Sequence, residues 1–145
     1  MYPIQQRAPH QSKAVTILRW IAVAPAAILG GFLARWVIVA VNAYGLRGIG
    51  GLEAGSLVEV MMSTLLGGAV LGAALVSIAV YVAPSHKGLA AMFFASAWIV
   101  VTIGAFVFAY DYYDWEILTE FVLASLVSAG IAYETFSKSK VSQDT

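Results

Sequence analysis

The sequence predicts an all-α integral membrane protein: a bundle of four transmembrane helices joined by short loops. Hydrophobic residues make up 61% of the 145 residues and charged residues only 11%, whereas about a quarter of the residues of a soluble domain carry charge. The apolar residues also gather in four long segments. A soluble fold of this size could not bury so much apolar surface, so we expect the chain to lie in a lipid bilayer.

The first predicted span covers residues 15–43 and follows a basic tail, residues 1–13. Basic residues before an apolar stretch also begin a signal peptide, but this stretch is much longer than a signal-peptide core. We therefore expect an uncleaved first helix. It carries Arg19 and Arg35 near its two ends.

Three further segments are predicted to cross the membrane, at residues 57–83, 87–109 and 115–136. Residues 60–86 and 88–110 contain no charged side chain, and each run exceeds the roughly 20 residues that a transmembrane helix needs. Ser56 followed by Glu59 has the spacing of a capping box, which predicts a helix start there.

The domain organisation is simple. Residues 14–136 form one predicted transmembrane domain, followed by a second tail at residues 137–145. The longest connector, residues 44–55, is rich in glycine and contains Arg47, and we interpret it as a flexible loop rather than a phosphate-binding loop because it follows no strand and lacks a lysine. These connectors leave no room for a domain outside the bilayer.

The basic residues predict the orientation of the chain. Only Arg35 and Arg47 lie at the end that holds the first and third loops. The other six lie in the two tails, near the start of the first span or in the second loop: Arg7, Lys13, Arg19, Lys87, Lys138 and Lys140. The positive-inside rule then places both termini in the cytoplasm, most naturally at a bacterial inner membrane, with a single orientation.

Small residues at four-residue spacing predict where the helices meet, because lipid-embedded helices associate through close backbone packing. Gly30 and Gly31 belong to such a ridge in the first span, and Gly68 and Gly72 form a GxxxG motif in the second. The motif is common by chance, so we favour packing within the chain over self-association for Gly68 and Gly72.

Three charged residues enter the predicted bundle: Arg35, Glu59 and Glu120. Ionisable groups at membrane depth are by default functional candidates. Each continues a ridge of small residues, so the three side chains are expected to converge in the half of the bundle opposite the termini. Structural explanations stay open: Arg35 as an interface anchor beside Trp36, Glu59 as a capping residue, and Glu120 as an ion-pair partner for Arg35.

An acidic and aromatic segment precedes and begins the fourth span, and contains Asp111, Asp114, Trp115 and Glu116. We interpret it as part of the aromatic belt at the membrane surface. The alternative is a recognition loop for a cation or a headgroup, although its spacing matches no EF-hand loop.

The sequence lacks the residues that several classes of membrane protein need for their function. The chain has no cysteine, its two histidines, His10 and His86, lie outside the spans, and no span interior contains a lysine. These absences argue against a bis-histidine haem, a thiol or zinc centre and a retinal-type Schiff base, so no cofactor or metal is expected. With a net charge of zero, no nucleic-acid partner is expected either.

These features favour a non-catalytic accessory or structural subunit of a larger membrane complex. Its expected partners are the lipid bilayer and either other membrane proteins or further copies of the chain. The alternative is a small homo-oligomeric transporter or channel in which Arg35, Glu59 and Glu120 form the site. A membrane enzyme is the weakest of the three hypotheses, because no catalytic constellation is evident.

Overall fold

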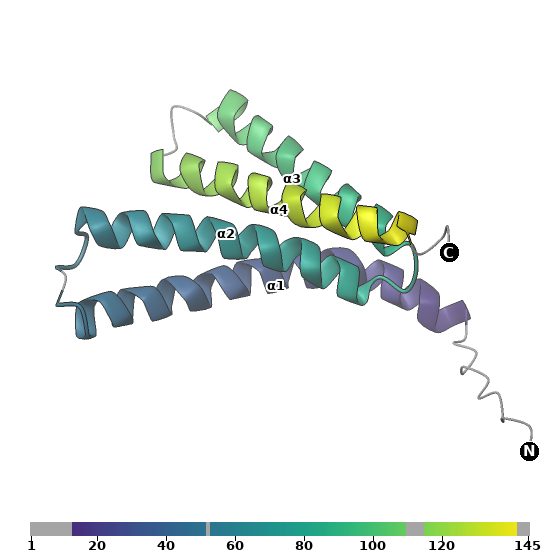
Figure 1. The fold of residues 1–145 in the computed structure, drawn as a ribbon, viewed down its shortest axis with the longest axis horizontal. Coiled ribbons are helices and arrows are strands. Elements are labelled where there is room, and N and C mark those ends of the chain that lie inside the picture. The colour runs from purple at the N-terminus through teal and green to yellow at the C-terminus, as the bar shows by residue number, and fades with distance from the viewer. Residues whose placement is uncertain (1–12, 52, 110–114, 142–145) are drawn as a thin grey trace, which may run out of the picture.

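The fold is all-α. The computed structural model describes residues 13–51, 53–109 and 115–141. Within them lie four α-helices, shown in Figure 1: α1 (Lys13–Gly48), α2 (Leu57–Val82), α3 (Lys87–Ala109) and α4 (Trp115–Val141). All four helices are long and apolar enough to cross a membrane, which indicates a membrane protein.

Helix α1 is longer than the sequence predicted. It continues beyond residue 43 to Gly48, so residues 44–48 belong to the helix and not to a flexible connector. An isolated glycine in a helix costs only about 1 kcal/mol, and Arg47 in the last turn interacts favourably with the helix dipole. The chain reverses further on, where Gly51 and Gly55 adopt positive φ angles of 63° and 76°.

The 36 residues of α1 correspond to about 54 Å of helix, well above the roughly 30 Å thickness of a hydrocarbon core. Pro25 lies inside α1 and cannot donate a backbone hydrogen bond to the preceding turn. Helix α1 bends along its length in Figure 1, as expected of a helix with an internal proline.

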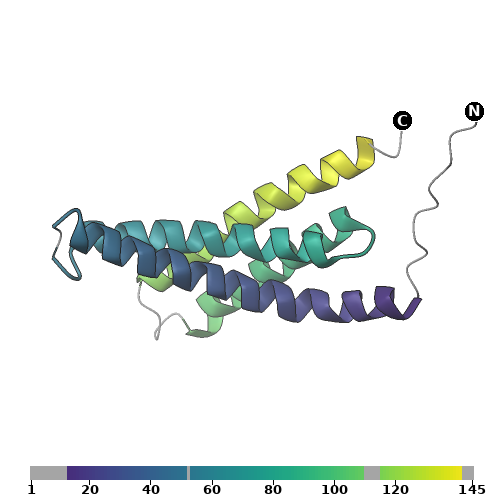
Figure 2. The same ribbon diagram turned by 90° about the horizontal axis from the view of Figure 1, so that it is seen from below.

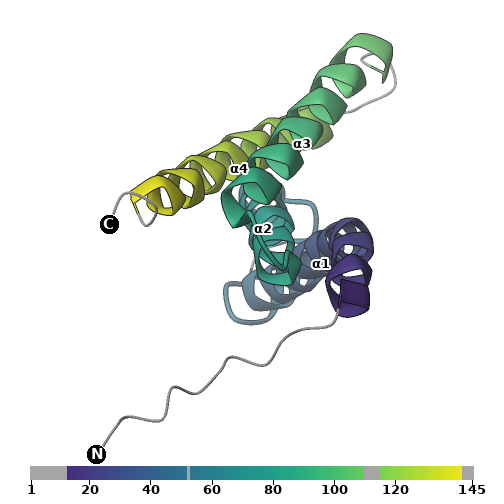
Figure 3. The same ribbon diagram turned by 90° about the vertical axis from the view of Figure 1, so that its right-hand side faces the viewer.

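Helix α2 lies at the centre of the molecule. It packs antiparallel to α1 on one side and against α3 and α4 on the other, and α3 and α4 also pack together (Figure 3). Within the described residues, the backbone of α1 comes close to that of α2 alone. The four helices therefore form an open arrangement rather than a closed bundle, and Figure 2 shows α1 and α4 diverging toward their terminal ends.

Glycines allow the closest helix contacts. A Cβ atom at Gly31 would lie 3.4 Å from Leu75 Cβ, so this glycine faces α2. Across the next interface, a Cβ at Gly72 would collide with the backbone of Ala124 on α4, and Ser128 Oγ donates a 3.2 Å hydrogen bond to the Gly72 carbonyl. Gly72 thus packs within the chain, against α4.

The core lies in the half of the molecule nearer the termini, where side chains of all four helices meet. Val23 and Ala27 of α1 and Val76 and Ala79 of α2 are at most 2% exposed. Trp98 of α3 forms the other end of this cluster, where its ring makes edge-to-face contacts with Phe32 and Phe121. Among the residues that the structure describes, no equivalent cluster fills the other half, which leaves room there for a polar pocket.

Candidate functional site

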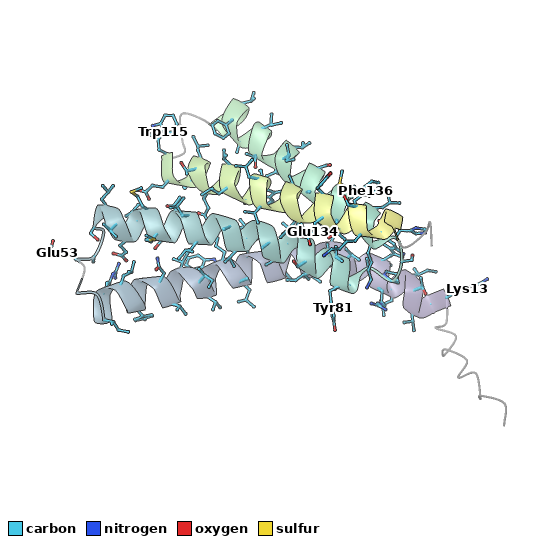
Figure 4. All side chains as sticks on the ribbon, viewed as in Figure 1. Lys13, Glu53, Tyr81, Trp115, Glu134 and Phe136 are labelled. Carbon is cyan, nitrogen blue, oxygen red and sulfur yellow. The ribbon has the colours of Figure 1, made fainter. Side chains whose placement is uncertain are left out.

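Charged side chains of three helices line one pocket near the end of the molecule that holds the α1–α2 loop. Figure 4 shows Glu53 of this loop and Trp115 at the start of α4 at this end, opposite Lys13. The pocket has a volume of about 250 Å³. We call it the charged pocket, after its charged lining residues: Arg35, Arg47, Glu59, Glu116 and Glu120.

Arg35 and Glu120 form a two-bond ion pair between α1 and α4. Arg35 Nη2 donates to Glu120 Oε2 at 2.7 Å, and Arg35 Nε donates to Glu120 Oε1. The Glu120 side chain is 9% exposed and that of Arg35 26% exposed. Fork-on-fork geometry of this kind makes the strongest class of arginine–carboxylate contact. The guanidinium also lies 5.6 Å from the ring centre of Trp36, within cation–π range.

Two glycines of α2 make room for Glu120. A Cβ atom at Gly67 would lie 2.9 Å from Glu120 Oε1, and one at Gly68 would lie 2.7 Å from the Glu120 backbone oxygen. Both distances are too short for a real Cβ contact. The glycine-rich part of α2 therefore lets α4 approach closely and lets the Glu120 carboxylate reach past α2 to Arg35.

A second ion pair closes the loop end of the pocket. Glu59 Oε1 accepts from Arg47 Nε at 2.9 Å and from Arg47 Nη2 at 2.8 Å. Its other oxygen, Oε2, accepts from the Gly55 backbone N–H at 2.8 Å. Ser56 is the N-cap of α2 and accepts a 3.5 Å bond from the Glu59 N–H. One half of a capping box is therefore present, while the Glu59 carboxylate bonds Gly55 instead of Ser56.

Polar groups complete the lining. Ser63 and Thr64 contribute hydroxyls from α2, and Asn42 Nδ2 donates a 3.0 Å hydrogen bond to Ser63 Oγ. Glu116 lies one turn before Glu120 on α4 and is exposed. Two guanidiniums thus face three carboxylates, so the pocket has a formal excess of one negative charge.

The structure brings the three predicted charges, Arg35, Glu59 and Glu120, to one pocket. They do not form a single cluster there but belong to two separate ion pairs. Arg35 binds Glu120, and Glu59 binds Arg47. Sequence reasoning missed Arg47, because the surrounding glycines suggested a loop. A signal was present, since an arginine followed by Gly48 is typical of a helix C-terminus.

The predicted recognition segment is only partly described. Asp111 and Asp114 lie outside the described residues. Trp115 and Glu116 begin α4, where the Trp115 side chain is 70% exposed, in keeping with a place near a membrane surface. Of these four residues, Glu116 lines the charged pocket.

A third arginine of α1 binds α2 at the opposite end of the molecule. Arg19 Nε donates to the Val82 carbonyl at 3.2 Å, and Nη2 donates to the Tyr81 carbonyl at 3.4 Å. These carbonyls end α2 and have no partner within the helix, so Arg19 acts as a cap. Arg19, Arg35 and Arg47 therefore fasten α1 to its neighbours near its start, beyond its middle and at its end.

The chemistry of the charged pocket is that of paired charges. Within the part of the chain that the structure describes, no three His, Cys, Asp or Glu residues are placed to hold a metal ion. Paired guanidiniums and carboxylates can fix helix positions or contact a polar ligand. Comparison of the chain with protein-family models, with curated proteins and with solved structures gives no match.

Proposed function

We propose that this protein is a non-catalytic accessory subunit of a larger membrane complex and that it binds its partner through α1. The observation that carries the proposal is the exposure of this helix. In the 18-residue apolar stretch that marks α1 as a candidate membrane span, only 17% is buried inside the molecule. In the corresponding stretch of α2, 39% is buried. Three arginines nevertheless hold α1 to the neighbouring helices. A helix held this firmly loses little further freedom on binding a partner.

The uncovered side of α1 is the surface that we propose for the contact. Leu29, Leu33 and Trp36 are 70%, 67% and 64% exposed, and their spacing places them on one side of the helix. Ala27 and Gly31, on the opposite side, are buried. Exposed apolar side chains are normal where a helix faces lipid, so their exposure alone does not support a partner surface. The support comes from finding them on α1, whose backbone, among the described residues, comes close to that of α2 alone.

Purification from native membranes in a mild detergent, through a tag at the C-terminus, tests this proposal. We expect a second membrane protein at a fixed stoichiometry. Changing Leu29 and Leu33 together to tryptophan should release that partner by steric obstruction. Leu126→Trp is the matched control, because Leu126 is 65% exposed on α4, away from α1.

Two results would contradict the accessory-subunit proposal. One is purification of the chain alone or as a homo-oligomer under conditions that preserve other membrane complexes. The other is a partner that is retained equally by the α1 variant and by the Leu126→Trp control.

The charged pocket favours a second candidate, a small homo-oligomeric transporter or channel. The pocket places five charged side chains between helices that can span a membrane, and intramembrane charge often marks a transport pathway. Reconstitution of the purified chain into liposomes would test this candidate. An ion flux that Glu116→Gln changes would support it, and no flux above that of empty liposomes would contradict it.

We further propose that both termini face the cytoplasm of a bacterial cell, with the charged pocket on the opposite side of the inner membrane. The support is the distribution of lysine and arginine, of which six of eight lie toward the tails and the α2–α3 loop. The reporter fusions described in the Discussion test this orientation.

A further inference from the structure

A groove opens between α1 and α3 at the end of the molecule that carries the chain termini. It has a volume of about 290 Å³. The main lining residues are Trp20, Val23 and Ala24 from α1 and Leu89, Phe93 and Phe94 from α3. None of its lining side chains is charged. The groove exists because the backbones of α1 and α3 do not come close together, so side chains alone border this space.

The groove runs along α1 and α3, the direction that an acyl chain beside these helices would take. Both α1 and α3 begin at the end that carries the termini and run toward the end that holds the α1–α2 loop (Figure 1). Along each helix the lining residues follow one another by about a turn, from Trp20 to Ala24 and from Leu89 to Phe93. The headgroup-proximal part of an acyl chain entering at the termini end can therefore lie along the two helices, in contact with the apolar side chains of the groove.

The mouth of the groove is positively charged. Lys87 begins α3, two residues before Leu89, and is exposed. The first N–H groups of α3 have no partner within the helix and form the positive end of its dipole. Lys13 begins α1 at the same end. Glu134, an acidic residue of α4 at this end, is paired with Lys138 at 2.6 Å, which offsets its charge.

Trp20 indicates the depth of the groove mouth. It lines the groove and is 40% exposed, and tryptophan is enriched at the level of lipid headgroups. An acyl chain in the groove would therefore have its headgroup near Trp20 and the start of α3. The negative charge of a phosphate fits the exposed Lys87 and the positive end of the α3 dipole.

We propose that this groove is a binding site for an anionic phospholipid, with one acyl chain along α1 and α3 and the phosphate at the start of α3. A zwitterionic lipid carries an additional ammonium group that Lys87 and Lys13 would repel, so the site should prefer the anionic class. This proposal is independent of the accessory-subunit and transporter proposals, because it uses none of the residues that they use.

Native mass spectrometry of the full chain in detergent tests the site, with phosphatidylglycerol and phosphatidylcholine of identical acyl chains as probes. We expect phosphatidylglycerol to bind more tightly. Lys87→Gln should weaken that binding about fivefold, the effect of one basic residue near a lipid surface. Lys87→Arg should restore it. Lys138→Gln is the matched control, because Lys138 is exposed at the same end but is already paired with Glu134.

A second variant tests the groove itself. Ala24 is exposed at its wall, so Ala24→Trp fills the groove without disturbing the core and should abolish the tight binding of both lipids. Unchanged lipid binding in Ala24→Trp would overturn the proposal. Equal binding of the two lipids would overturn it, as would equal losses in Lys87→Gln and Lys138→Gln. Displacement of the lipid by inorganic phosphate would do the same, since it would indicate a simple anion site.

Discussion

The Arg35 guanidinium on α1 forms two hydrogen bonds with the Glu120 carboxylate on α4, although the backbones of these helices do not come close together. The pair therefore spans a gap that no close helix contact fills. Phe32 lies about one turn before Arg35 on α1, and Phe121 follows Glu120 on α4. Both rings contact Trp98, so side chains of α1, α3 and α4 meet beside the ion pair. The position of α1 relative to α4 thus depends on a few specific side chains.

The glycines of α2 should be intolerant of even one methyl group. At Gly72 the added Cβ would collide with the backbone of Ala124, and at Gly68 it would lie 2.7 Å from the Glu120 backbone oxygen. Overpacking of this kind costs about 1 to 3 kcal/mol. We expect Gly72→Ala and Gly68→Ala to lower the free energy of unfolding by this amount, measured by denaturation in mixed micelles.

Two other helical glycines provide the control for this prediction. Gly104 on α3 and Gly130 on α4 have no atom within 4 Å of the position of an added Cβ. Gly130→Ala and Gly104→Ala should leave stability unchanged or raise it, by up to about 1 kcal/mol. Equal losses in all four variants would contradict the assignment of Gly68 and Gly72 to a tight helix contact.

Arg19 should stabilise the end of α2. Its guanidinium donates to the carbonyls of Tyr81 and Val82, which would otherwise lack partners at the helix end. Arg19→Gln should therefore reduce stability by about 1 kcal/mol. It should also speed hydrogen exchange in the last turn of α2, measured by mass spectrometry. Protection in that turn identical to that of the unmodified protein would argue against the cap.

Arg47 and Glu59 should respond unequally to neutralisation. Arg47→Gln removes the cation beside a carboxylate whose side chain is 7% exposed. Glu59→Gln keeps an oxygen that can still accept from the Gly55 N–H, so the start of α2 keeps one of its bonds. We expect faster hydrogen exchange at the start of α2 in Arg47→Gln than in Glu59→Gln. The reverse order would contradict the prediction, because it would mean that a Glu59 carboxylate without Arg47 costs less stability than an Arg47 guanidinium without Glu59.

The proposed orientation predicts the behaviour of reporter fusions. Green fluorescent protein fused after Thr145 should fluoresce, since it folds in the cytoplasm. Alkaline phosphatase inserted in the α1–α2 loop should be active, since it requires the periplasm. Activity of alkaline phosphatase at the C-terminus would reverse the proposed orientation.

Much of the fold could be predicted from hydropathy, because a transmembrane helix needs a continuous apolar run and the chain has four of them. The starts of α2, α3 and α4 at Leu57, Lys87 and Trp115 agree with the predicted spans. The end of α1 was predicted too early, because glycines favour loops in general, and the helix-end signal of Arg47 followed by Gly48 was not used. Local propensity does not reveal that Glu59 accepts from this arginine.

The charged pocket was only partly predictable for a related reason. Helical spacing showed that Arg35 and Glu120 each continue a ridge of small residues, and the pairing of these two charges was one of the open alternatives. Spacing along single helices cannot give the register between helices or the gap between α1 and α4. These depend on contacts such as that of Gly67 with the Glu120 carboxylate, which join residues far apart in the chain.

The most direct test of how α1 is held in place is a double-mutant cycle on Arg35 and Glu120, with unfolding measured in mixed micelles. Arg35→Leu and Glu120→Leu should each lower the free energy of unfolding by about 1 to 3 kcal/mol, because each leaves a partly buried charge without its partner. The double variant should lose clearly less than the sum of the two single losses. Additive losses would contradict the account, because they would mean that Arg35 and Glu120 do not hold α1 and α4 together.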